Sequence, residues 1–269
     1  TNELLGRATA NTTVLGCVGN APGAVQGVAA SQYDKWLTNP SRAACGSCHD
    51  DVDFETGEGH SVGIPQPDDM FCGQCHPATM SQEYDITIPG AHTVDYLSTQ
   101  LPGVLIRLMD IRDTAPGMTP TVTFDLRNKN AAMKPGDLGR LRLSIAGPND
   151  DYMHYSGLED VIGKSTKVDG YWEYTFEWAI PDDAEGSYTL GAEGRVNEVL
   201  INEGQPNEFG MRDQAENPTL AFAIEGEATP TDGHGAVPRR MVVTDQQCEA
   251  CHGNLSLHGD NRHGTDYCV

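Results

Sequence analysis

Three copies of one short pattern, Cys-x-x-Cys-His, constrain this chain more than any other feature. This pattern is the attachment motif of a c-type haem. Two thiols add to the vinyl groups of one haem, and the adjacent histidine supplies an axial nitrogen to the iron. The three copies are Cys45-Gly46-Ser47-Cys48-His49, Cys72-Gly73-Gln74-Cys75-His76 and Cys248-Glu249-Ala250-Cys251-His252. The spacing therefore predicts three covalently bound haems c, with His49, His76 and His252 as the proximal ligands of the iron.

Zinc sites and disulfides are the alternatives for paired cysteines. Zinc also favours Cys-x-x-Cys pairs, but a zinc ribbon gives no reason for histidine to follow the second cysteine every time. Three chance occurrences in 269 residues are negligible. Covalent haem attachment implies maturation outside the cytoplasm, a compartment that also permits disulfides.

Two cysteines lie outside the three motifs. Cys268 is the penultimate residue, and we expect it to begin a fourth haem motif that the end of the chain cuts in half. A disulfide between Cys17 and Cys268 is the alternative. The chain starts at Thr1 with neither an initiator methionine nor a signal peptide, which is typical of a mature or excised chain.

The chain has more histidines than the motifs need. Of nine, three are assigned as proximal ligands, and six remain for three or four haems. This surplus predicts bis-histidine ligation, which makes methionine ligands unnecessary. The pairing of ligands stays open at this stage. The distal candidates, in glycine-rich segments that let the backbone approach a flat macrocycle, are His60, His92, His258 and His263, with His234 a weaker candidate, whereas His154 is expected to be structural or to lie on the surface.

The long segment without cysteine, between Cys75 and Cys248, has the pattern of β-structure. Short runs rich in β-branched and aromatic residues alternate with turn clusters such as Pro116-Gly117. Six or more antiparallel strands separated by turns predict a β-sandwich or split barrel. The predicted strands cover residues 104–111, 121–126, 141–146, 171–178, 186–193 and 220–225, and we expect the aromatic run 171–178 to lie in the core.

The chain thus divides into a haem-binding segment at 1–100, a β-sandwich or split-barrel domain at 101–230, and the start of a second multihaem domain at 231–269. The fold class is mainly β plus irregular segments, because apolar macrocycles rather than side chains would form the core around the motifs. Acidic pairs such as Asp50-Asp51 are expected to be solvated loops. A Ca²⁺ ion held by such oxygens is an open alternative, although no EF-hand spacing is present.

The charge excludes two classes of partner. Lys and Arg total 17 against 39 Asp and Glu, giving a formal net charge of −22. A field of that sign repels nucleic acid and anionic lipid. The sequence has no run of 18 apolar residues, so no transmembrane segment is predicted.

Three stretches resemble the OmcA/MtrC decahaem family, the outer-membrane multihaem cytochromes of metal-reducing bacteria. They are Pro40–Asp50 around the first motif, Gly90-Ala91-His92-Thr93, and Arg239-Arg240-Met241-Val242-Val243 running through Cys248 to Leu257-His258-Gly259. They cover about a third of the chain. Members alternate β-barrel and pentahaem domains, so this chain resembles an internal portion: the end of one pentahaem domain, the second β-domain and the start of the next pentahaem domain.

The resemblance implies electron transfer by haem-to-haem hopping at the outer membrane or cell surface. The implied partners are other multihaem cytochromes and an outer-membrane porin–cytochrome complex, and the implied acceptors are Fe(III) or Mn(IV) minerals, flavins or another cytochrome. A periplasmic location is less favoured. An electron-transfer protein is favoured over a substrate-specific enzyme, and a role as a terminal metal reductase stays open. Three alternatives also remain: a subunit of an extracellular cytochrome filament, a multihaem reductase with one open-coordinated haem, and a zinc-binding adhesion module.

Overall fold

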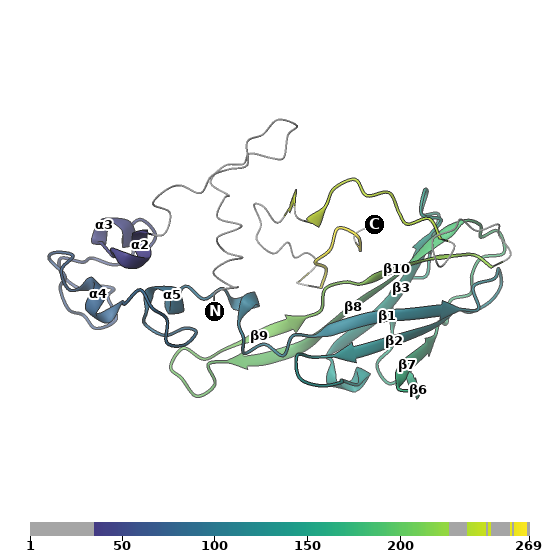
Figure 1. Ribbon diagram of the computed structural model, residues 1–269, viewed down its shortest axis with the longest axis horizontal. Helices are drawn as coiled ribbons and strands as arrows, with labels where there is room; N and C mark the ends of the chain where they lie inside the picture. Colours follow the sequence, from purple (N-terminus) through teal and green to yellow (C-terminus); the bar gives the residue numbers. More distant parts are fainter. Residues whose placement is uncertain (1–34, 226–235, 246, 249–258, 260, 268–269) are drawn as a thin grey trace. The chain divides into compact units, whose positions relative to one another are not determined.

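The computed structural model describes residues 35–225, 236–245, 247–248, 259 and 261–267 (Figure 1). The chain forms two compact units. The first unit comprises residues 1–99 together with the short segment 202–208, and the second comprises 100–201 and 209–269. Each unit is described by itself.

The first unit is irregular, as expected for the segment that carries two haem motifs. The helices in its described residues are one turn long: α2 (Lys35–Thr38), α3 (Arg42–Cys45), α4 (Cys72–Cys75), α5 (Ile88–Ala91) and the 3₁₀ turn η2 (Asp95–Leu97). In its described part, Ile88 is the one large apolar side chain that is fully buried. Eight others are exposed to solvent: Trp36, Val62, Ile64, Met70, Phe71, Ile86, Val94 and Tyr96.

The second unit is built from two antiparallel sheets (Figure 1). One has the strand order β1-β2-β7-β6, and the other β10-β8-β3-β4, with β5 pairing with β3 and β9 with β8. A short 3₁₀ turn, η3 (Pro135–Asp137), lies between β2 and β3. The strands are β1 (Leu105–Arg112), β2 (Thr121–Arg127), β3 (Arg140–Gly147), β4 (His154–Tyr155), β5 (Glu159–Asp160), β6 (Thr166–Val168), β7 (Tyr171–Thr175), β8 (Ser187–Ile201), β9 (Phe209–Gln214) and β10 (Thr219–Ala223).

The core of the second unit consists of the apolar side chains that alternate along both sheets. On β3, Leu141, Leu143 and Ile145 are fully buried, and the residues between them face the other way. Successive side chains of a strand point to opposite faces, so this alternation places one row in the core. Phe124 on β2 and Leu190 on β8 join the same cluster. The prediction of a mainly antiparallel β-fold is therefore confirmed, with two open sheets and no closed barrel.

All six predicted strands are present, but two differ in length. β8 extends to Ile201, eight residues beyond the predicted end, where it pairs with β9. β7 ends at Thr175, because the carboxylate of Glu159 accepts the backbone N–H groups of Glu177 and Trp178. The aromatic run is only partly core. Tyr174 and Phe176 are buried, Trp172 and Trp178 pack against them, and Tyr171 is exposed.

The described residues 261–263 contact the second sheet. The side chain of Asn217 accepts the backbone N–H of His263 and donates to the carbonyl of Asn261. Glu193, which is fully buried on β8, forms ion pairs with Arg140 of the neighbouring strand and with Arg262 of this segment. A buried carboxylate needs such partners, since an unpaired charge in a protein interior is costly.

The acidic pairs Asp50-Asp51, Asp68-Asp69 and Asp182-Asp183 are mainly exposed, as expected. Asn149, beside a further acidic pair, donates to the carbonyl of Val237 and accepts from Thr189, so its side chain is already used. Across the described ranges, no three His, Cys, Asp or Glu side chains gather in a way that would hold a metal ion, so the calcium alternative gains no support.

No helix in the same ranges is long and apolar enough to cross a membrane.

Candidate functional site

The first motif begins on a capped helical turn. Ser41 lies at the N-cap of α3, and its side chain accepts the backbone N–H of Ala44, the usual arrangement for a serine at that position. The helix ends at Cys45, and the backbone N–H of His49 donates to the carbonyl of Cys45 over 2.9 Å. This hydrogen-bonded turn spans both cysteines and the histidine of the motif.

The second motif has the same local structure. The backbone N–H of His76 donates to the carbonyl of Cys72, again over 2.9 Å. In both motifs the first cysteine is half-buried and the second is exposed, and all four thiols are free. Burial raises the pKa of the Cys72 thiol, and the charge of Asp69 adds to the effect.

A tight loop between the motifs presents His60. The carboxylate of Asp53 accepts the backbone N–H groups of Glu55 and Thr56, and this holds the pKa of Asp53 below its ordinary value. The backbone of Gly59 has a φ of +77°, and a Cβ there would overlap the carbonyl oxygen of Asp51. Only glycine fits this position without strain. One ring nitrogen of His60, Nδ1, is buried without a hydrogen-bond partner in the described residues.

A second turn held by a carboxylate that accepts several hydrogen bonds positions His92 at the C-terminal end of α5. Thr87 caps the helix, and Asp85 accepts hydrogen bonds from the backbone and hydroxyl of both Ser81 and Thr87. Burial alone would raise the pKa of Asp85, but these hydrogen bonds outweigh it and hold the pKa well below its ordinary value. His92 Nδ1 lies 2.7 Å from the carbonyl oxygen of Ile88, and this contact fixes the orientation of the ring.

The four histidines of the first unit form two pairs. The ring centroids of His49 and His92 are 6.2 Å apart with an angle of 77° between the planes. The centroids of His60 and His76 are also 6.2 Å apart, again at 77°. Each pair thus joins one motif histidine to one of the distal candidates of the sequence.

This spacing fits two ligands on opposite sides of one metal ion. An imidazole nitrogen binds a transition metal at about 2.0–2.1 Å and the ring centre lies about 1.1 Å further, so two opposed rings have centroids about 6.3 Å apart. Edge-to-face packing of aromatic rings covers about 4.5–7 Å and does not explain why two separate loops reproduce one value. A haem needs only two protein ligands, whereas zinc and calcium need more, and no larger cluster exists among the described residues.

Hydrogen bonds on the far side of the rings favour the same use. His76 Nδ1 lies 2.8 Å from the carbonyl oxygen of Ile86, and His92 Nδ1 has the equivalent contact with Ile88. Metal-ligating histidines use their second nitrogen in this way, which leaves Nε2 for the metal. The exposed apolar side chains of the first unit are also suited to contact a large apolar macrocycle. The residues present therefore fit haem.

The structure describes only some of the remaining residues predicted to bind haem. Cys248 is half-buried with a free thiol, and His263 packs on the second unit, with Nε2 in contact with the side-chain oxygen of Gln214. His154 has the structural role expected from the sequence, since its Nδ1 lies 2.6 Å from the hydroxyl of Tyr188. Six other residues lie outside the described ranges: Cys17, His234, Cys251, His252, His258 and Cys268.

The residues that support the ligands are not predicted from the sequence. Trp36 lies edge-on to His92 with ring centroids 5.2 Å apart. Asp85 shapes the turn that carries His92. Such contacts depend on how the chain folds back over tens of residues, and the one local signal was the Ser-x-x-x-Asp-x-Thr spacing around Asp85.

No family model matches the sequence, and no curated protein matches it either. In fold, the chain is similar to the crystal structure of MtrC from Shewanella baltica OS185, with a TM-score of 0.58 and 20% sequence identity. The match covers 90% of this chain and 44% of that one, so this chain spans less than half of the length of MtrC. At this identity the similarity establishes an MtrC-like fold. It agrees with the family that the motifs resemble.

Proposed function

We propose that this chain is a multihaem c-type cytochrome that carries electrons outside the cytoplasm. The observation that carries the proposal is the presence of two histidine pairs. In each pair, the histidine of a Cys-x-x-Cys-His motif has its ring centroid 6.2 Å from that of a second histidine. The MtrC-like fold supports the same function independently of the motifs.

The residues of the chain then have defined roles. Cys45 and Cys48 would hold one haem and Cys72 and Cys75 another, with His49 opposite His92 and His76 opposite His60. Bound haem supplies the redox chemistry, because its iron accepts and releases single electrons. The carbonyls of Ile86 and Ile88, which contact His76 and His92, would make these two imidazoles stronger ligands of a bound iron. By the same sequence motif, Cys248, Cys251 and His252 would hold a third haem, and Cys268 would begin a fourth site.

Two strong ligands on each iron favour electron transfer over substrate reduction, because a reductase needs an open position. The proposed partners follow from the fold of MtrC and the family resemblance: other multihaem cytochromes, a porin–cytochrome complex, and extracellular metal oxides or flavins as acceptors. The proposed location is the outer-membrane surface or the extracellular space. The β-sandwich would be a scaffold or docking surface.

The test is a visible spectrum of the oxidised and reduced protein with a pyridine haemochrome count per chain. We expect three or four low-spin c-type haems. A variant and its control make the test specific. The double variant Cys72→Ala, Cys75→Ala should remove one haem, whereas His154→Ala should remove none. A substantial high-spin fraction in the wild type would favour the reductase alternative, and a colourless protein would exclude the proposal.

A further inference from the structure

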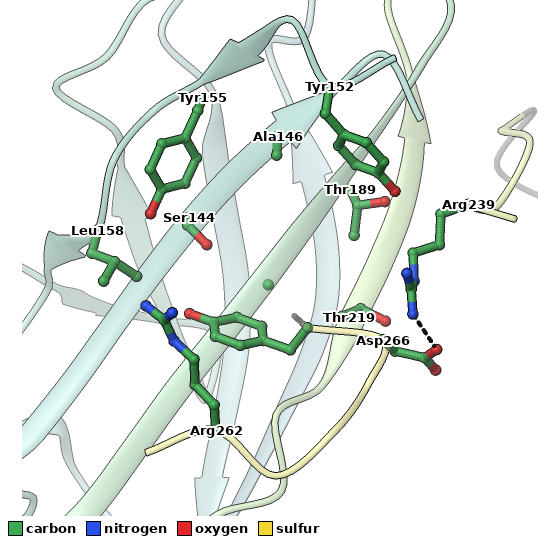
Figure 2. Close-up of a pocket in the computed structure, with 12 residues that line it drawn as sticks. Ser144, Ala146, Tyr152, Tyr155, Leu158, Thr189, Thr219, Arg239, Arg262 and Asp266 are labelled. Carbon is green, nitrogen blue, oxygen red and sulfur yellow. Dashed lines mark hydrogen bonds and ion pairs between the residues drawn. The ribbon is translucent and has the colours of Figure 1, made fainter. Parts of the chain in front are cut away.

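The outer face of the second sheet holds a cavity of about 80 Å³ that the haem motifs do not use (Figure 2). Its floor consists of small side chains that point away from the core, including Ser144 and Ala146 on β3 and Thr189 on β8. Gly191 also belongs to the floor, and a Cβ there would lie 2.6 Å from the ring of Tyr267. The lack of a side chain at this position therefore lets the tyrosine ring lie directly on the sheet.

The rim of the cavity carries two arginines and two tyrosines. Figure 2 shows Arg239 and Arg262 on opposite sides of the cavity, with Tyr152 and Tyr155 above the sheet. Asp266 is the one acidic residue of the lining, and its carboxylate is paired with Arg239 at 3.1 Å. Arg262 is paired with the buried carboxylate of Glu193. Both arginines therefore have a counter-charge, and the hydrogen-bond donors of the lining decide what the cavity can bind.

Three polar atoms of the lining are buried without a hydrogen-bond partner in the described residues: Tyr152 Oη, Tyr267 Oη and Arg239 Nε. Burial raises the pKa of Tyr152, and Arg239 only partly offsets it. Burial also raises the pKa of Tyr267, the charge of Glu193 adds to the effect, and the nearby hydroxyl of Ser144 only partly offsets it. Both phenols therefore stay protonated at neutral pH and remain donors. Buried donors without acceptors are rare in folded proteins because each costs about 1–3 kcal/mol.

We propose that this cavity binds a carboxylate group, held by Tyr152, Tyr267 and Arg239. A carboxylate has two oxygens and about four acceptor positions, which matches convergent donors that lack an acceptor. The size of the cavity admits a short carboxylate and excludes a large ring system. The carboxylate comes either from a small free acid or from the propionate side chain of a haem of this chain. The second source rests on the proposed function, and the first does not.

The test uses the haem-loaded protein and the propionate ion as the probe. Thermal unfolding is followed against propionate concentration, with propionamide and chloride as neutral and ionic controls. The variants Tyr152→Phe and Tyr267→Phe each delete one hydroxyl without changing the ring. Tyr155→Phe is the matched control, because Tyr155 lines the same cavity but is 56% exposed.

If the source is a free acid, propionate raises the unfolding midpoint of the wild type in a saturable way. Each of the two test variants then weakens the affinity about tenfold, as expected for losing a hydrogen bond to a charged group, while Y155F does not. If a haem propionate already fills the cavity, added propionate has no effect, but Y152F and Y267F shift the midpoint potential of one haem relative to Y155F.

If Y152F and Y267F behave as Y155F does, both in their response to propionate and in their haem midpoint potentials, the cavity holds only water and the inference is overturned. The haem count is measured on every variant. A chain without haem would contradict the proposed function, yet the response to free propionate would still decide this inference.

Discussion

The imidazoles of His60 and His76 face each other at 6.2 Å although sixteen positions separate them in the chain, and those of His49 and His92 repeat the arrangement across forty-three. The shorter span lies within the longer one, because His60 and His76 both lie between His49 and His92. The ligand pairing proposed above rests on these two distances, and it can be tested one histidine at a time.

Replacing His92 should change one haem only. In the variant His92→Met, a thioether takes the place of an imidazole opposite His49, and methionine ligation raises the reduction potential of a haem. We expect one component of a redox titration to move to higher potential while the others stay in place. His154→Ala is the control, since His154 contacts Tyr188 and neither pair. An unchanged titration in His92→Met would contradict the proposed pairing.

Variants at two glycines near His60 distinguish the effect of a steric clash from that of backbone strain. Gly59 and Gly63 both have positive φ, +77° and +61°. A Cβ at Gly59 would overlap the backbone of Asp51, whereas a Cβ at Gly63 meets nothing within 4 Å. Both alanine variants carry the same kind of backbone strain, but only Gly59→Ala displaces the loop. We expect Gly59→Ala to reduce the low-spin absorbance by about one haem and Gly63→Ala to leave it unchanged.

The turn that carries His92 should lose stability in acid. The pKa of Asp85 is lowered in the folded state because Ser81 and Thr87 donate to the carboxylate, in spite of its burial. Its contribution is therefore complete above the unfolded pKa of about 3.9 and is lost as the pH falls towards the folded value. In Asp85→Asn, the pH dependence of unfolding should flatten below about pH 4.

The readout for this variant is the unfolding midpoint followed at the haem absorbance from neutral to acid pH. Asp50→Asn serves as the control because Asp50 is exposed. Equal slopes for wild type and Asp85→Asn would show that the carboxylate does not stabilise this turn.

The ion pairs of Glu193 should matter far more than those on the surface. Glu193 is fully buried between Arg140 and Arg262. The variant Glu193→Gln leaves both arginines without their counter-charge, which costs about 3 kcal/mol of unfolding free energy. Glu177→Gln breaks an exposed pair with Lys164 and should change the stability very little. Chemical denaturation of the two variants, followed by tryptophan fluorescence, compares them directly.

The sequence predicted the strands wherever burial alternates, as in Leu141-Arg142-Leu143-Ser144-Ile145, because one face of each sheet covers the core. It failed to predict the second half of β8, since Arg195–Ile201 does not alternate and pairs with β9 mostly at the surface. The short strands β4, β5 and β6 have two or three residues each, too few to show a period.

For the candidate site, the motif chemistry identified the ligand types, because the order of cysteine and histidine is local. The pairing of His49 with His92 and of His60 with His76 could not be predicted, because it depends on the path of the loops between them. The cavity on the second sheet was missed for the same reason. Tyr152, Arg239 and Tyr267 come together from segments more than a hundred residues apart at the extremes.

The division of the chain into units has a practical consequence for protein dissection. The segment 202–208, between β8 and β9, belongs with the first unit, so the backbone passes between the units at 99/100, at 201/202 and again at 208/209. Within the first unit, Asn207 of this segment donates to the carbonyl of Tyr84. One protease cut after Thr99 would therefore leave a nicked protein rather than two fragments, and a recombinant piece that stops at residue 99 would lack part of its own unit.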